Sequence, residues 1–264
     1  MSQLTSHSIV PVREDLKVAA LLGLLAALAT ALLFPYLMLV MPEALAKLPM
    51  PLWVVVIAQV AQVGVLLTIV SLCGLRMGHS VGLGAPWLRA LLFRRPLPVP
   101  RPPWLLALIS GLLAGVLIVS LDPLFAPHMP SLLHAQAPVA AQASAFVGFL
   151  ASFYGGIAEE LQLRLFLMTL LVWAITRLGR STVTPLIAWS AVLIAAVVFG
   201  AGHLPAAAHV WPLDAVVITR TLLLNGVGGV LFGWFFWKHG LETAMLAHFG
   251  TDLVLHVLAP LAMG

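Results

Sequence analysis

Long, nearly unbroken hydrophobic stretches separated by short polar segments dominate the chain. A helix needs about 20 predominantly apolar residues to cross the hydrocarbon core of a bilayer. Apolar stretches of that order predict membrane-spanning helices, and the pattern therefore predicts an all-α polytopic membrane protein. The stretches are Val18–Met41, Leu52–Leu75, Trp104–Leu121, Val183–His203, Ala215–Trp237 and Leu241–Ala259.

A longer apolar stretch, Val139–Thr176, lies between the third and the fourth of these spans. As one helix it would be ~55 Å long at ~1.5 Å per residue, which exceeds the ~30 Å thickness of the hydrocarbon core. We expect this helix to be strongly tilted, to project from the bilayer, or to break near Gly155-Gly156. A single crossing gives seven spans in total, and a double crossing gives eight.

Composition agrees with this class of protein. The chain is 62% hydrophobic and only 8% charged, whereas soluble domains carry about 25% charged residues. The net charge of +4 does not predict a nucleic-acid partner, because the basic residues lie mostly at the ends of apolar segments. A single cysteine excludes an internal disulfide and a Cys-based zinc cluster. No repeat is evident, so residues 1–264 are expected to form one domain.

The distribution of arginine predicts the orientation of the chain in the membrane. The segment between the second and third spans is rich in arginine, has no acidic residue among those arginines, and includes residues 82–103, a predicted basic loop. The positive-inside rule places this loop and the N-terminus in the cytoplasm, and the cell (inner) membrane is the expected location. The arginines are Arg76, Arg89, Arg94, Arg95 and Arg101.

Charged side chains inside an apolar stretch call for an explanation, because the bilayer interior penalises each by about a few kcal/mol or more. Glu159, Glu160 and Arg164 lie in such a stretch. On a helix, Glu160 and Arg164 share one face and can form an ion pair. Glu159 points about a third of a turn away, so it can remain free and act as a base. The alternative is a buried ion pair that only fixes the helix register.

Two further segments place histidine in apolar surroundings. His203 ends an apolar run, after two glycines that permit close helix approach, but a lone histidine there can also be an ordinary interfacial residue. His248 and Asp252 are four residues apart and share a helical face, so both can contact a common water or metal. Glu, two His and Asp form a ligand set that Zn²⁺ accepts. His256, one turn beyond Asp252, is a candidate partner of the site.

These residues resemble the signature of a known family, the CAAX protease and bacteriocin-processing (CPBP, or Abi) group of intramembrane proteases, which includes the Ras-converting CAAX endopeptidases. Its motifs are Glu-Glu-x-x-x-Arg, Phe-x-x-x-His and His-x-x-x-Asn or Asp. Here they correspond to residues 159–164, 199–203 and 248–252. The resemblance covers approximately residues 146–258. Asp252 stands where the prenyl-protein endopeptidases have Asn, and an ionised Asp cannot donate a hydrogen bond to an oxyanion.

The resemblance implies an intramembrane endopeptidase that acts on a membrane-anchored protein or peptide, such as a prenylated CAAX protein. Hydrolysis inside lipid requires a hydrated polar cavity within the membrane. Two mechanisms are open: Zn²⁺ held by Glu159, His203 and His248, or direct activation of water by Glu and His without a metal. In the resemblance, the catalytic residues are Glu159, His203, His248 and Asp252, and the supporting residues are Glu160, Arg164 and Phe199.

Two other classes of protein fit the same residues. A proton-coupled transporter or channel also places Glu, His, Asp and Arg within membrane helices. A non-catalytic immunity or scaffold protein would keep the motifs for stability alone. A substitution of Glu159 distinguishes the three classes. It removes peptide cleavage in a protease and transport in a transporter or channel, and it removes neither function in a non-catalytic protein.

Overall fold

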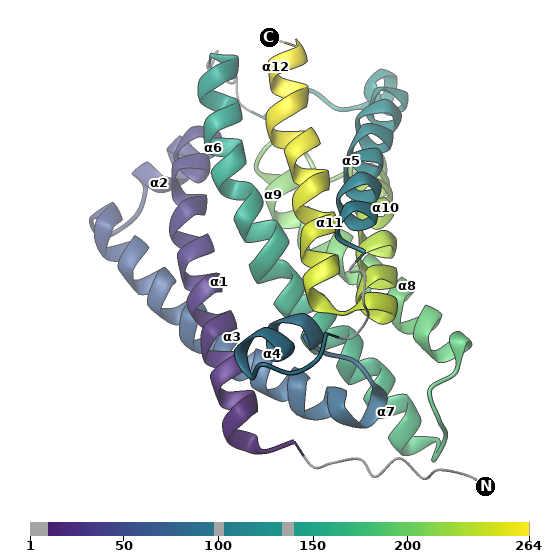
Figure 1. Ribbon diagram of the computed structural model, residues 1–264. Coiled ribbons are helices and arrows are strands. Elements are labelled where there is room, and N and C mark those ends of the chain that lie inside the picture. Colours follow the sequence, from purple (N-terminus) through teal and green to yellow (C-terminus); the bar gives the residue numbers. More distant parts are fainter. Residues whose placement is uncertain (1–9, 98–102, 134–139, 264) are drawn as a thin grey trace, which may run out of the picture.

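The computed structural model describes residues 10–97, 103–133 and 140–263, and every regular element in these residues is a helix (Figure 1). Within these residues, seven helices are long and apolar enough to cross a membrane, which confirms the prediction of an all-α polytopic protein. Four are α1 (Val12–Val40), α3 (Leu52–Val81), α5 (Trp104–Leu121) and α10 (Ala215–His239). The other three are composite. The span of α5 continues through the short η1 (Asp122–Leu124), and short α2 (Pro42–Ala46), α4 (Pro86–Leu92) and η2 (Ala126–His128) lie in the connections.

The composite helices change geometry or direction along their length. The longest spans 38 residues and consists of α6 (Ala141–Phe153), two π-helical segments η3 (Tyr154–Glu159) and η4 (Leu161–Met168), and α7 (Thr169–Leu178). The second is α8 (Pro185–Gly202) followed by α9 (Leu204–Ala208). The third is α11 (Leu241–Leu253), π-helical η5 (Val254–Leu258) and α12 (Ala259–Met263).

The structure shows how the long apolar stretch is accommodated as one helix. The chain does not break near Gly155-Gly156, because helical structure continues from Ala141 to Leu178 as one candidate span. Instead, the helix becomes π-helical at Tyr154, directly before these glycines. The seven-span alternative is therefore the one that the structure contains.

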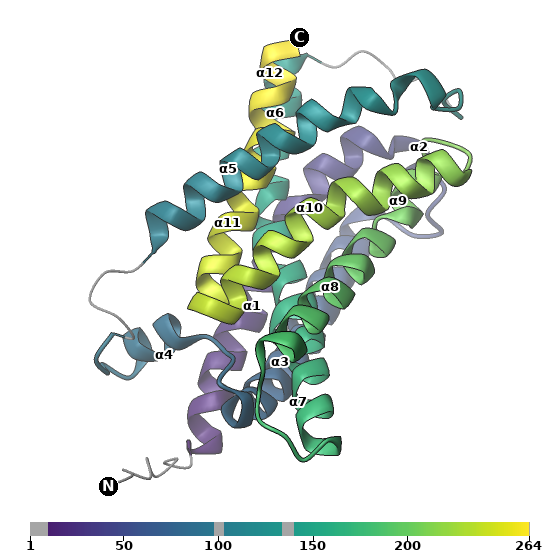
Figure 2. The same ribbon diagram turned by 90° about the vertical axis from the view of Figure 1, so that its right-hand side faces the viewer.

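Small residues allow the helices to pack closely, as expected where hydrophobic burial from water cannot drive helix association. A Cβ atom at Gly111 of α5 would overlap the carbonyl of Ala247 on α11, and one at Gly148 of α6 would overlap the carbonyl of His256. In Figure 1, α11 lies between α6 and α5, and Figure 2 shows α5 and α10 running across it. Helix α11 therefore packs against three other spans.

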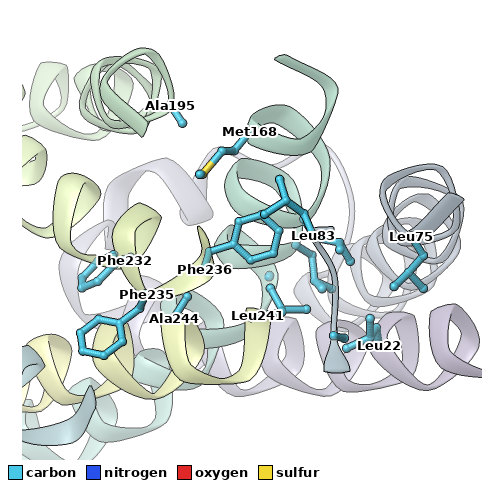
Figure 3. Close-up of a cluster of buried hydrophobic side chains, with 14 of the residues drawn as sticks. Leu22, Leu75, Leu83, Met168, Ala195, Phe232, Phe235, Phe236, Leu241 and Ala244 are labelled. Atoms are coloured by element: carbon cyan, nitrogen blue, oxygen red, sulfur yellow. The ribbon is translucent and has the colours of Figure 1, made fainter. Parts of the chain in front are cut away.

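A hydrophobic cluster surrounds the first turns of α11. Figure 3 shows phenylalanines of α10 packed against Leu241 and Ala244 of α11, with Leu83 from the turn before α4 close by. Many large apolar side chains on the outside of the bundle remain exposed, including Leu105 and Leu186, which suits a surface that faces lipid. The cluster holds the beginning of α11 in a fixed place. The phenylalanines are Phe232, Phe235 and Phe236.

Ion pairs join the beginning of α1 to the end of α3 and to α4. Asp15 is fully buried and accepts hydrogen bonds from Arg76 at 2.9 Å and from His79 at 3.0 Å. Arg89 of α4 contacts both Asp15 and Glu14. This network gathers basic residues of the predicted loop at the end of the bundle where α1 begins (Figure 1). Arg101 lies outside the described residues, and the side of the membrane that this end faces remains a prediction.

Candidate active site

Glu160 and Arg164 lie in the π-helical region and are both fully buried. Nη1 of Arg164 lies 2.9 Å from Oε1 of Glu160, so the predicted contact is present. Nη2 of Arg164 donates to the carbonyl of Gly229 at 3.2 Å. The guanidinium carbon is also 4.9 Å from the ring centre of Phe199 and 5.3 Å from that of Phe232. These contacts compensate a charge that would otherwise be costly inside the bundle.

Glu160 also orients the imidazole of His248. Nδ1 of His248 lies 2.8 Å from Oε1 of Glu160. An ionised carboxylate only accepts hydrogen bonds, so the proton is assigned to Nδ1, and Nε2 of the neutral imidazole is left as an acceptor. The ring of Phe232 stacks on the imidazole with centroids 4.2 Å apart, and Phe199 meets it edge-on at 5.4 Å. Hydrogen bonding and aromatic packing together fix where Nε2 points.

Nε2 of His248 faces two further carboxylates. It is 3.7 Å from Oε2 of Glu159 and 3.7 Å from Oδ1 of Asp252. That separation is too long for a direct hydrogen bond, but two atoms so placed can both hydrogen-bond a single water molecule at about 2.8 Å. The side chain of Glu159 is 22% exposed, whereas that of Glu160 is 0% exposed. The neighbouring carboxylates thus differ in environment: one is enclosed and paired, and the other is accessible.

Glycine at position 155 makes this arrangement possible. A Cβ atom there would overlap a carboxylate oxygen of Asp252 and would lie 3.0 Å from Nε2 of His248. The absence of a side chain at Gly155 therefore lets the long helix approach α11 at the level of the polar residues.

His203 bonds to a backbone carbonyl and not to one of these carboxylates. It caps the end of α8, and its Nδ1 donates to the carbonyl of Phe199 at 2.9 Å, which leaves Nε2 without a proton in the neutral imidazole. Its ring is 4.7 Å from that of Phe199, which in turn meets His248. Within the described residues, no hydrogen bond or ion pair joins His203 to a carboxylate. The structure brings Glu159, Glu160, His248 and Asp252 together directly, and Phe199 links His203 to them.

Sequence reasoning missed Phe232, which contacts both Arg164 and His248. Several phenylalanines occur near it in the chain, and nothing in the local pattern separates it from Phe235 or Phe236. It also missed the carbonyl of Gly229 as a partner of Arg164. Both residues lie on α10, which carries none of the three motifs.

The predicted zinc ligands do not form a complete set. Among residues 10–97, 103–133 and 140–263, no group of three or more His, Cys, Asp or Glu side chains is positioned to hold a metal ion. Glu159 and His248 approach each other, but His203 does not join them. The arrangement does not fit a three-ligand zinc site, and zinc remains a prediction.

Two cavities lie away from these residues. One is at the basic end of the bundle, and the other is an apolar cavity among α5, α8 and α10. Neither is lined by Glu159, His203 or His248. A hydrated cavity at the polar residues therefore also remains a prediction.

A family model described as type II CAAX prenyl endopeptidase Rce1-like matches residues 141–254. This segment of the chain is similar to the Rce1-like family. The Rce1-like segment contains all three motifs and begins at the first residue of α6.

At the level of the family, this match supports a CAAX-type intramembrane protease with a membrane-associated protein as substrate. Together with the seven apolar helices, it supports an integral multi-pass membrane protein. No curated protein and no solved structure gives a significant match to the chain.

Proposed function

We propose that the chain is an intramembrane endopeptidase that hydrolyses a peptide bond near the C-terminus of a prenylated, membrane-anchored protein. The observation that carries this proposal is the convergence of Oε2 of Glu159 and Oδ1 of Asp252 on Nε2 of His248. These atoms lie in helices that are long and apolar enough to span a membrane. Ionisable groups inside membrane helices are costly, and chemistry at the site explains why the chain contains them.

Glu159 acts as the general base in this proposal. It removes a proton from a water that Nε2 of His248 also hydrogen-bonds, and the water oxygen then attacks the carbonyl carbon of the substrate. The resulting tetrahedral intermediate breaks its carbon–nitrogen bond, and Glu159 delivers the same proton to the departing nitrogen. Positioned proton transfer of this kind contributes about 10²–10⁴-fold to the rate.

The two histidines and Asp252 have separate parts in the mechanism. Glu160 holds His248 by Nδ1, so that Nε2 faces the attacking water. The carbonyl of Phe199 holds His203 by Nδ1, and in this proposal Nε2 of His203 contacts the substrate. When it is ionised, Asp252 only accepts hydrogen bonds, and in that state it orients water and does not stabilise the oxyanion.

The distribution of basic residues supports an orientation with the N-terminus in the cytoplasm. The ends of α3, α7 and α10 carry arginine or lysine, and so does the start of α1. Opposite ends of the same helices carry few. By the positive-inside rule, the basic end is cytoplasmic, and in a bacterial cell the chain resides in the inner membrane.

A matched pair of peptide reporters tests the proposed activity. The purified chain, in lipid nanodiscs, is incubated with a CAAX-type peptide that carries a farnesyl group on its cysteine and with the same peptide without the group. We expect mass spectrometry to show cleavage after the modified cysteine and little cleavage of the unmodified peptide. A folded chain that cuts neither peptide contradicts the proposed substrate class.

Phe232→Leu is expected to lower turnover about tenfold, because loss of the stacked ring releases both His248 and Arg164. Phe235→Leu is the matched control: Phe235 is also buried on α10, but its ring packs on Trp234 and His239. Both variants lose some stability, which thermal unfolding measures. Equal losses of turnover in the two variants would show that Phe232 only fills space.

A further inference from the structure

A cavity of about 360 Å³ opens between the end of α3, helix α4 and the turn from α10 to α11. Hydrogen bonds hold these segments together. The indole of Trp87 donates to the carbonyl of His239 at 3.0 Å, and the amide of Leu241 donates to the carbonyl of Gly84 at 3.0 Å. The amide of Leu88 donates to Oε1 of Glu242 at 2.6 Å. The walls are therefore fixed before any ligand enters.

Basic side chains line this cavity, and no aspartate or glutamate is among its lining residues. Arg89 is held in place by Glu14 and Asp15, and Asp15 also holds His79. Lys238 differs, because no carboxylate lies within 4.0 Å of it in the described part of the chain. Its ammonium group instead lies 3.6 Å from the ring centre of Trp237. The basic lining residues are His79, Arg89, Lys238 and His239.

The charge around the cavity remains positive when the neighbouring acidic residues are included. These carboxylates are fewer than the arginine and lysine side chains around the cavity, which stay charged. The two histidines that line the cavity add positive charge when they are protonated. The carboxylates are Glu14, Asp15 and Glu242, and the fixed cations are Arg76, Arg89, Arg95 and Lys238.

Aromatic residues place the cavity at the level of the lipid headgroups. Trp87 packs against Trp104 with ring centroids 4.9 Å apart, and Trp237 lines the cavity. Tryptophan concentrates where the hydrocarbon meets the headgroups. Helix α4 extends Leu91, which is 76% exposed, to the outside of the bundle, as an interfacial helix does. Basic pockets between membrane helices at this depth suit phosphate headgroups.

We propose that this cavity binds the phosphate group of an anionic headgroup, with Lys238 and Arg89 as the cations that contact it. The phosphate comes from an anionic phospholipid or from a soluble phosphate ester, and the same walls recognise both. Gly240 in the cavity wall precedes His248 by eight residues, which is about 12 Å along a helix. A ligand that joins α3, α4 and this turn thereby stabilises the beginning of the helix that carries His248 and Asp252.

Lipid titration of the whole purified chain in a neutral detergent tests the proposal. Native mass spectrometry counts the bound molecules, and thermal unfolding is the second readout. The ligands are phosphatidylglycerol, zwitterionic phosphatidylcholine and soluble glycerol phosphate. We expect one phosphatidylglycerol to bind more tightly than phosphatidylcholine and to raise the unfolding temperature with its concentration. Equal protection by glycerol phosphate also supports the site and assigns it to a soluble ester.

Two charge variants locate the site. Lys238→Gln is expected to weaken phosphatidylglycerol binding about fivefold, since one cation near an anionic headgroup contributes about 1 kcal/mol. Arg177→Gln removes an exposed cation at the end of α7, outside the cavity, and should change binding less than twofold. Equal weakening by both variants, or equal binding of the two lipids by the parent chain, would overturn the proposal. These measurements do not depend on peptide cleavage.

Discussion

Glu159→Gln is expected to reduce peptide cleavage by about 10²–10⁴-fold while the protein remains folded. Glutamine keeps the size of the side chain but cannot accept the proton of water, and general-base catalysis accounts for a rate factor of this size. Stability should change little, because Glu159 is partly exposed and its contact with His248 is a long 3.7 Å. Initial rates with the farnesylated reporter, followed in nanodiscs beside the parent chain, measure the effect.

A carboxylate outside the site provides the control for this variant. Glu43 is exposed on the short helix α2, and Glu43→Gln removes the same charge without touching the motifs. It should retain full activity. Unchanged turnover in Glu159→Gln would remove this carboxylate from the mechanism, and loss of ion transport without any cleavage would instead favour a proton-coupled transporter.

The spans could be predicted from hydropathy, but their ends could not. Helix α1 begins at Val12, not at Val18, and α3 continues to Val81, beyond the predicted Leu75. The additional turns contain charged residues that no apolar pattern includes. They remain helical because Asp15 pairs with Arg76 and His79, and those partners lie more than 60 residues away in the chain. Such tertiary pairing has no local signal in the sequence.

The site shows the same division between local and distant contacts. Four-residue spacing predicted the pair of Glu160 with Arg164, and it placed His248 on the same face as Asp252. Which carboxylate His248 would bind could not be predicted, because Glu160 is 88 residues away. The bond of His203 to the carbonyl of Phe199 was equally hidden. The part of the site that Phe232 supplies depends on how α10 packs, and the motifs do not encode that.

The π-helical segments had no sequence signal either. The length of the apolar stretch and Gly155-Gly156 indicated that an ordinary straight helix was unsuitable, and a break was one expected solution. The structure keeps the helix and changes its geometry from Tyr154 onwards, in the segment that carries Glu159 and Arg164. π-helical turns often occur at functional sites, where they change the direction in which side chains project.

Arg164→Met is expected to destabilise the protein by about 3–5 kcal/mol, because it leaves Glu160 charged and buried without its cation. Both side chains are 0% exposed, so water cannot replace the lost partner. The variant also removes the hydrogen bond to Gly229 and the contacts with Phe199 and Phe232. Denaturant unfolding in detergent micelles, compared with the parent chain, measures the difference.

The double variant Arg164→Met, Glu160→Gln separates the charge effect from loss of packing. A neutral glutamine needs no cation, and replacing both partners of a buried ion pair is often neutral or stabilising. We therefore expect the double variant to regain most of the stability that the single variant loses. It should still be a poor enzyme, because an uncharged residue at position 160 holds His248 more weakly. A double variant as unstable as the single one would mean that the aromatic contacts of Arg164, and not its ion pair, stabilise this part of the bundle.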